Sequence, residues 1–182
     1  IEHAHIGGSL AELERAFDPV KYGEDTEQPW LDVRVPTVEN PALAPAGCDV
    51  VTVLATGFAA LSGGAPGAKY ADAPDEREDM AYDAIVDSLE AYAPGIGDSI
   101  VASSLRLPDA LQRDFSLSGG HLWQGEAALD QLLTFRPSPT CAAGQTPIDG
   151  LWLCGGGIHP GGGVRTVNGV LAARRCLAAK SS

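Results

Sequence analysis

Glycines are concentrated at one junction near the C-terminal end of the chain, with six of them in the run Gly155–Gly163. The short apolar stretch LWLC (151–154) precedes this run, and the segment 164–180, which has helical spacing, follows it. The first N–H groups of a helix have no partner within the helix and carry partial positive charge, so they attract electron-rich groups. Glycines remove side chains and let a ligand contact the backbone. The junction therefore has residue types suited to binding an anionic or electron-rich cofactor.

Three interpretations of the glycine run compete. A Walker phosphate loop requires Gly-Lys-Ser/Thr after its glycines, whereas this run ends in Gly163-Val164-Arg165. A Rossmann fingerprint opens a βαβ unit and has an acidic residue about 20 positions later, but fewer than 20 residues follow the run. The third interpretation is structural: the glycines let a strand and a helix pack closely.

Two histidines near the start of the chain are the other pattern that could bind a ligand. His3 and His5 are two residues apart in the predicted strand 2–8, so their side chains point to the same face. Such a pair can bind a transition metal. No carboxylate or cysteine has the spacing to complete the site, so we predict no metal, and elemental analysis would reveal one.

Other polar patterns favour solvent-exposed roles. Glu126 and Asp130 have i,i+4 spacing, which places like charges on one helix face and is typical of exposed residues. The acidic run Asp72–Asp79 is typical of a solvated helix start. No Gly-x-Ser-x-Gly elbow is present, and no residue is assigned a catalytic role.

Composition limits the function classes. The chain has 182 residues and a net charge of −12, which argues against nucleic acid and anionic lipid surfaces as partners. No apolar run approaches the length of a membrane span and no signal peptide is recognised, so we expect a cytoplasmic protein. The four cysteines lack CxxC spacing, and we predict buried free thiols at Cys48, Cys141, Cys154 and Cys176.

Hydrophobic periodicity predicts an α+β fold with a mixed or antiparallel sheet and helices on one face. The predicted strands are 2–8, 29–37, 48–59, 99–108 and 151–154, and the second and third should form an antiparallel hairpin. The predicted helices are 9–18, 75–95, 108–115 and 164–180. On the last helix we expect an apolar buried face made of Val167, Val170, Leu171, Leu177 and Ala178.

The C-terminal stretch TPIDGLWLCGGGIHPGGGVRTVNGVLAARR (146–175) resembles the flavin-binding motif of the phytoene-desaturase-like FAD-dependent oxidoreductases, within the amine-oxidase-type flavoproteins. GGHLWQGEAALDQLLTFRPSPT (119–140) is similar to a second segment of that family, and the stretches 5–17 and 98–115 look like its substrate domain. The resemblance implies a substrate-binding domain over 1–140 and a flavin-contacting strand, loop and helix over 141–182. The family's N-terminal Rossmann unit has no counterpart, so another chain or a missing segment would supply it.

The resemblance also implies which residues contact FAD. Gly155 and Gly156 would lie beside the ribityl and pyrophosphate groups, and Gly157 and Gly162 would let the flavin ring lie flat. The family's helix start, here Gly163-Val164, would point at the pyrimidine edge of the ring. Asn168 would contact either the cofactor or loop backbone. Arg165 stands where the family has small residues, and solvent is its expected environment.

Several side chains have both a substrate-site and a structural interpretation. His121 and Trp123 would either wall the substrate site or belong to the core, and His159 would line the cavity or bind the loop backbone. Arg136 would brace the flavin-domain junction or, as we favour, lie at the surface. The implied function is hydride transfer from a small, apolar organic substrate to flavin N5, in a heteromer with the chain that carries the Rossmann half. The alternative is a binding or assembly module that keeps the fold without a cofactor.

Overall fold

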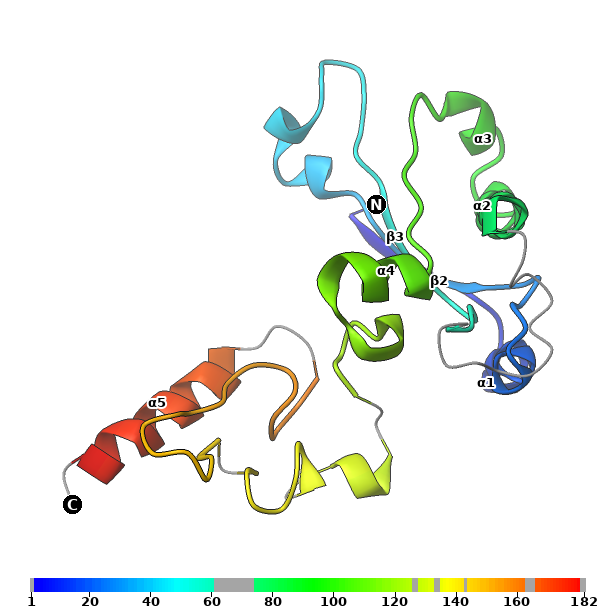
Figure 1. Cartoon of the computed structure of the whole chain (residues 1–182). Helices are drawn as coiled ribbons and strands as arrows, with labels where there is room; N and C mark the ends of the chain where they lie inside the picture. The colour runs from blue at the N-terminus through cyan, green and yellow to red at the C-terminus, as the bar shows by residue number, and fades with distance from the viewer. Residues whose placement is uncertain are drawn as a thin grey trace. The chain divides into compact units, whose positions relative to one another are not determined.

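The computed structural model describes residues 2–60, 74–125, 128–132, 135–142, 144–162 and 166–180. The chain divides into two compact units, 1–110 and 111–182, which are described separately (Figure 1). The predicted α+β class is confirmed by an antiparallel sheet together with several helices. Among the described residues, no helix has the length and apolar character needed to cross a bilayer. The proposed division at residue 140 concerns function rather than compactness and stays a prediction.

A three-stranded antiparallel sheet forms the centre of the N-terminal unit. Its strands are β1 (His3–Ile6), β2 (Trp30–Arg34) and β3 (Thr52–Thr56), in the order β1-β2-β3. All three lie within the predicted strands, and the β2–β3 pairing confirms the predicted hairpin. The register places His5 opposite Asp32, and Asp32 opposite Leu54.

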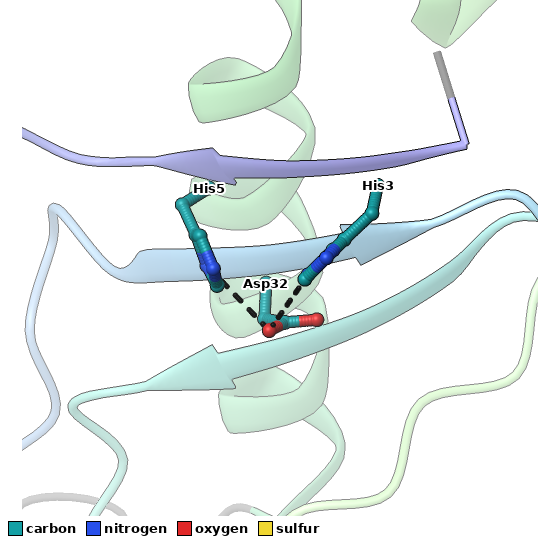
Figure 2. Close-up of side chains that lie close together, drawn as sticks. All are labelled: His3, His5 and Asp32. Atoms are coloured by element: carbon teal, nitrogen blue, oxygen red, sulfur yellow. Dashed lines mark hydrogen bonds and ion pairs between the residues drawn. The ribbon is translucent and has the colours of Figure 1, made fainter.

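The two faces of this sheet differ in chemistry because side chains alternate along each strand. One face carries the more buried residues Ala4, Ile6, Leu31, Val33, Val53 and Ala55. Figure 2 shows helix α2 (Pro74–Glu90) crossing behind the sheet, on the side away from His3 and His5. Leu31 on the sheet and Ala81 and Leu89 on the helix are among the most buried apolar residues. This apolar layer is the core of the unit.

A buried arginine ties three segments of the N-terminal unit together. The Arg77 side chain, only 3% exposed, donates from Nε and Nη2 to the two carboxylate oxygens of Asp25, at 2.6 and 2.8 Å. Its Nη1 donates to Asp109 at 2.6 Å, and Nη2 also donates to the Ala59 carbonyl. Burial lowers the pKa of Arg77, but the hydrogen bonds to Asp25 and Asp109 outweigh it and raise that pKa overall. The acidic residues around it, Asp75, Glu76, Glu78 and Asp79, are exposed as predicted, so only the arginine of this helix start is buried.

The remaining helices agree with the sequence better than the remaining strands do. The described helices are α1 (Leu10–Phe17), α3 (Ile96–Ser99), α4 (Pro108–Phe115) and α5 (Thr166–Lys180). Short 3-10 turns occur at Pro19–Tyr22, Pro36–Val38, Pro41–Leu43, Ser118–Gly120 and Leu129–Gln131. Helices 9–18, 75–95, 108–115 and 164–180 are thus confirmed, with ends shifted by a few residues.

The predicted strand 99–108 is wrong. Helix α3 ends at Ser99, residues 100–107 then run to α4 without strand pairing to any described residue, and Val101 is 90% exposed. The Glu90 carboxylate accepts the N–H groups of Gly95 and Gly97, both at 2.7 Å, and this turns the chain after α2. Apolar, β-branched residues alone do not make a strand, because a strand also needs the edge of a neighbouring strand to pair with. The predicted strand 151–154 is likewise reduced to one bridge between Gln145 and Trp152.

Candidate functional site

The described part of the glycine-rich loop, 155–162, lies in the C-terminal unit just before α5. Gly155, Gly161 and Gly162 have φ values of +107°, +76° and +68°. These are left-handed conformations that side-chain-bearing residues rarely adopt, so the loop path itself requires glycine there. The predicted cofactor contacts Gly163 and Val164, and also Arg165, lie outside the described residues.

Asn168 holds the start of this loop. It lies in the first turn of α5 with only 1% of its surface exposed, and its amide nitrogen donates to the Gly155 carbonyl at 2.5 Å. Its Oδ1 is buried and has no hydrogen-bond partner among the described residues. The Asn168 amide therefore binds the loop backbone, which is one of the two roles predicted for it. The buried acceptor leaves one polar contact still to be made.

Arg136 holds the adjacent peptide. Its guanidinium donates from Nε to the Gln131 carbonyl at 3.0 Å and from Nη1 to the Gly156 carbonyl at 3.4 Å. The residue is 7% exposed, so the favoured prediction of a surface arginine is wrong and the bracing interpretation is supported. A Cβ added at Gly125 or Gly161 would lie 2.5 Å from a guanidinium nitrogen. These glycines make room for the arginine.

The glycines of the loop therefore divide into two kinds. Gly157 and Gly161 face side chains of the chain itself, because an added Cβ would come within 3.2 Å of Gln124 or 2.5 Å of Arg136, respectively. At Gly155 and Gly162 an added Cβ would meet nothing within 4 Å. Internal packing accounts for the first pair, whereas the second pair borders open space that a ligand can approach.

The face that α5 buries differs from the predicted one. Asn168 and Ala172, one turn apart, are its buried residues, and Val167, Val170 and Leu177 are each at least 40% exposed. Ala172 lies near Gly144, where an added Cβ would be 3.8 Å from the Ala172 side chain. The hydrogen bond from Asn168 to the loop fixes which side of the helix faces inward, and hydrophobic spacing did not contain that information.

A pocket of about 760 Å³ lies in the same unit and includes one loop glycine. Its lining combines apolar and polar residues: Phe115, Ser116, Leu117, Ser118, Gly119, His121, Gln124, Gly125, Gln131 and Gly157. The backbone N–H of Trp123 donates to Nδ1 of His121 at 3.1 Å. Because Nδ1 accepts, the neutral ring carries its proton on Nε2 and can donate from there. A cavity of this size and mixed lining suits a small organic ligand.

The other two substrate-site candidates do not join His121. Trp123 is 49% exposed and is absent from both the pocket lining and the described core. His159 is half-buried and also does not line the pocket, and its buried Nδ1 has no partner among the described residues. The predicted hydrogen bond from the His159 ring to the loop backbone is therefore not made by Nδ1 with any described residue.

A second cluster of ligand-type side chains lies on the polar face of the sheet in the N-terminal unit. Figure 2 shows His3 and His5 of β1 converging on Asp32 of β2. His3 Nε2 lies 3.1 Å and His5 Nδ1 3.5 Å from the same oxygen, Oδ2, while Arg34 Nε donates to Oδ1 at 3.0 Å. Hydrogen bonds from Arg34 and then His3 lower the pKa of Asp32. The carboxylate that sequence spacing lacked is thus supplied by the neighbouring strand.

Among the described residues, neither the cysteines nor Asp130 joins a cluster of metal-ligating side chains. All four thiols are free, as predicted, but none is buried: Cys48 and Cys154 are exposed, and Cys141 and Cys176 are half-buried. The prediction of buried thiols is wrong because these residues occupy loops and the outer part of α5. Asp130 is exposed as expected, and Glu126 lies outside the described residues.

Sequence comparison identifies the chain's relatives, although no protein-family model matches it. It is 37% identical over 163 residues to the rat (Rattus norvegicus) pyridine nucleotide-disulfide oxidoreductase domain-containing protein 2, which covers 88% of this chain and 27% of that protein. The lycopene-forming phytoene desaturase of Pseudescherichia vulneris is 32% identical, covering 81% of the chain and 27% of the desaturase. Prolycopene isomerase 2 of an Oncidium hybrid is 29% identical, covering 79% and 24%.

The chain is homologous to part of the phytoene-desaturase-like oxidoreductases. The resemblance inferred from the glycine-rich motif is therefore confirmed. The chain spans about a quarter of the length of these relatives. The names of these relatives describe an oxidoreductase-domain protein, a desaturase and an isomerase.

Sequence reasoning missed Asp32 and Arg77 and undervalued Arg136. A signal for Asp32 was present, because the alternation of Leu31 and Val33 already put Asp32 on the polar face; only the strand register was missing. Arg77 stands in an acidic helix start and gave no sign of burial. Arg136 lies in the Arg-Pro pair of the family-like segment, which was a signal for a structural role.

Proposed function

We propose that the chain forms the substrate-binding part and the C-terminal flavin-contacting part of an FAD-dependent oxidoreductase. Another chain, or a segment beyond this one, supplies the Rossmann half that binds the adenine end of FAD. The observation that carries this proposal is the loop 155–162, whose path is fixed by Asn168 and Arg136 while Gly155 and Gly162 border open space. When bound, FAD would accept a hydride from the substrate at N5.

The loop residues fit such a cofactor. Asn168 and Arg136 bind the carbonyls of Gly155 and Gly156, and a trans peptide points its N–H opposite to its carbonyl. The N–H groups of Gly156 and Gly157 therefore point away from the side chains that hold the loop. Backbone donors arranged in this way suit phosphate or ribityl oxygens. Asn168 Oδ1, buried without a described partner, is a further acceptor for a cofactor hydroxyl or N–H.

The pocket beside Gly157 is the proposed substrate site. Phe115 and Leu117 give it apolar surface for a small organic substrate, and His121 supplies an orienting N–H donor from Nε2. The role of these side chains is to bind and orient the substrate and to exclude water. Gly163, Val164 and the rest of the helix start are proposed to contact the flavin ring.

The exposed apolar side chains of α5 support a missing half. Val167, Val170 and Leu177 leave much of their surface in solvent. In a complete flavin domain, the Rossmann half would cover apolar surface of this kind. The isolated chain is therefore expected to bind FAD weakly, because it has only part of the cofactor's contacts.

Flavin content tests the function directly. The native protein, purified from its source with all co-purifying chains, should be yellow and release FAD identified by mass spectrometry. Gly162→Ala should lower the flavin content severalfold, because its methyl group would enter the space assigned to the ligand. Gly150→Ala is the matched control: Gly150 has a similar φ of +79° and no neighbour within 4 Å, but it lies outside the loop.

Three results would separate the alternatives. A colourless native protein without FAD would contradict the flavoenzyme and favour a binding or assembly module. Equal flavin content in both alanine variants would contradict the role of Gly162. Stoichiometric, tight FAD binding by the monomeric 182-residue chain, measured by fluorescence titration, would contradict the need for a separate Rossmann half.

A further inference from the structure

The polar face of the N-terminal sheet carries three ligand-type groups that no part of the proposed flavin chemistry uses. They are the imidazoles of His3 and His5 and the carboxylate of Asp32, drawn in Figure 2. Their potential ligand atoms all lie within 4.8 Å of one another. We propose that they form a binding site for a divalent transition-metal ion, with Zn²⁺ as the preferred ion.

The fold places these groups for structural reasons that are independent of any ion. His3 and His5 are two residues apart on β1 and point to one face, and the antiparallel register puts Asp32 of β2 directly opposite His5. Directly paired residues on neighbouring strands have side chains about 5 Å apart at Cβ. Strand pairing therefore brings all three groups together in the folded sheet.

The distances suit a shared ion. Two ligands each about 2.1 Å from a tetrahedral metal lie roughly 3.4 Å apart. His3 Nε2 and His5 Nδ1 lie 3.1 and 3.5 Å from Asp32 Oδ2, which matches that spacing closely. Both rings approach a single carboxylate oxygen, so the three ligand atoms already converge from different directions.

Arg34 orients the carboxylate of Asp32. Its Nε donates to Oδ1 of Asp32 at 3.0 Å and leaves Oδ2 to the two histidines. A hydrogen bond of this kind orients a metal-binding carboxylate from outside the coordination shell. Arg34 therefore fixes the direction in which Oδ2 points.

Exposure and ligand type decide which ion fits. The side chains of His3, His5 and Asp32 are 39%, 67% and 24% exposed, so an ion can enter from solvent and complete its coordination with water. Two imidazoles with one carboxylate favour Zn²⁺ and similar ions, whereas Mg²⁺ prefers oxygen ligands. The chain's net charge of −12 favours cations in general.

Zinc titration of the full 182-residue chain tests the site. The four free thiols would also bind zinc, so they are first alkylated with iodoacetamide. Isothermal calorimetry should then show one equivalent of Zn²⁺ bound and no comparable heat with Mg²⁺. His5→Ala should weaken binding at least tenfold, since even losing an outer-shell partner weakens metal binding by about 10–100-fold.

His121→Ala is the matched control, because it removes a histidine of the other unit and should leave zinc affinity unchanged. Circular dichroism of both variants verifies folding, and the highly exposed His5 is not needed for it. As a second measurement, zinc should shift the imidazole NMR signals of His3 and His5 and leave those of His121 in place. Absence of zinc binding, or unchanged affinity in His5→Ala, would overturn the proposal.

Discussion

Within the described part of the chain, each unit has one deeply buried arginine, and the two arginines have different partners. Arg77 in the N-terminal unit binds the carboxylates of Asp25 and Asp109 across three chain segments. Arg136 in the C-terminal unit binds the backbone carbonyls of Gln131 and Gly156. The first joins helix α2 to the first turn of α4 and to the loop at Asp25 through charge, whereas the second sets the path of a loop through backbone dipoles. Loop geometry can thus be specified by a side chain far from it in sequence.

Removing Arg77 should give the largest effect. Arg77→Met keeps a similar length but removes the Arg77 cation from the partly buried carboxylates of Asp25 and Asp109. Breaking a buried pair in this way costs about 3–5 kcal/mol of unfolding free energy. Urea denaturation measures it. Arg34→Met is the control, because the ion pair of Arg34 with Asp32 is exposed and should contribute less than about 1 kcal/mol. Equal losses of unfolding free energy in the two variants would show that the buried ion pairs of Arg77 stabilise the fold no more than an exposed pair does.

Removing Arg136 should have a smaller but more local effect. Arg136→Met loses two charge-assisted hydrogen bonds to carbonyls, and we expect a loss of about 3 kcal/mol. Amide hydrogen exchange should speed up in the loop 155–162 more than in the sheet, because the loop relies on this guanidinium. Arg136→Lys keeps the charge but lacks the planar guanidinium, so its stability and its loop exchange rates should lie between those of the wild type and Arg136→Met. Exchange that rises equally in the sheet would contradict a role confined to the loop.

The same contrast explains what the sequence could and could not predict. Strands 2–8 and 29–37 were predicted from alternating side chains, which report on a two-faced sheet, and strand 48–59 was predicted from its β-branched residues. The segment 99–108 also contains apolar residues suited to a strand, such as Ile100, Val101 and Leu105, yet it pairs with nothing among the described residues. Periodicity encodes the faces of an element, whereas its partners depend on the whole fold.

The candidate site shows the same limit. The glycine run and Asn168 could be recognised as parts of a motif. The hydrogen bond from Asn168 to Gly155, however, goes with an orientation of α5 in which Val167 and Val170 are exposed, and the sequence did not predict it. Likewise His3 and His5 were recognised as a pair, whereas Asp32 joins them only through strand register. Contacts between distant segments decided each of these outcomes.

Alanine at two glycines with matched backbone angles sharpens the role of Arg136. Gly150→Ala and Gly161→Ala have nearly equal φ values, +79° and +76°, so both lose roughly 1–2 kcal/mol to left-handed strain. Only at Gly161 would the new Cβ press against the guanidinium, at 2.5 Å, and overpacking of this kind adds about 1–3 kcal/mol. Urea denaturation gives the difference. In the Arg136→Met background, the difference between the two alanine variants in lost unfolding free energy should shrink. If it does not, a group other than the Arg136 guanidinium opposes the new methyl group at residue 161.

The smallest effect concerns the turn after α2 and depends on pH. Hydrogen bonds from the N–H groups of Gly95 and then Gly97 lower the pKa of Glu90 below its usual value of 4.5. Because the folded-state pKa is the lower one, this carboxylate stabilises the fold above the unfolded-state pKa, and the stabilisation is lost as pH falls through the folded-state pKa. Glu90→Gln keeps an acceptor oxygen but loses the charge. Its denaturation midpoint should lie slightly below that of the wild type at pH 7, and the two midpoints should converge as the pH is lowered from about 5 toward 3. A constant difference across that range would mean that Glu90 acts through its shape and not through its charge.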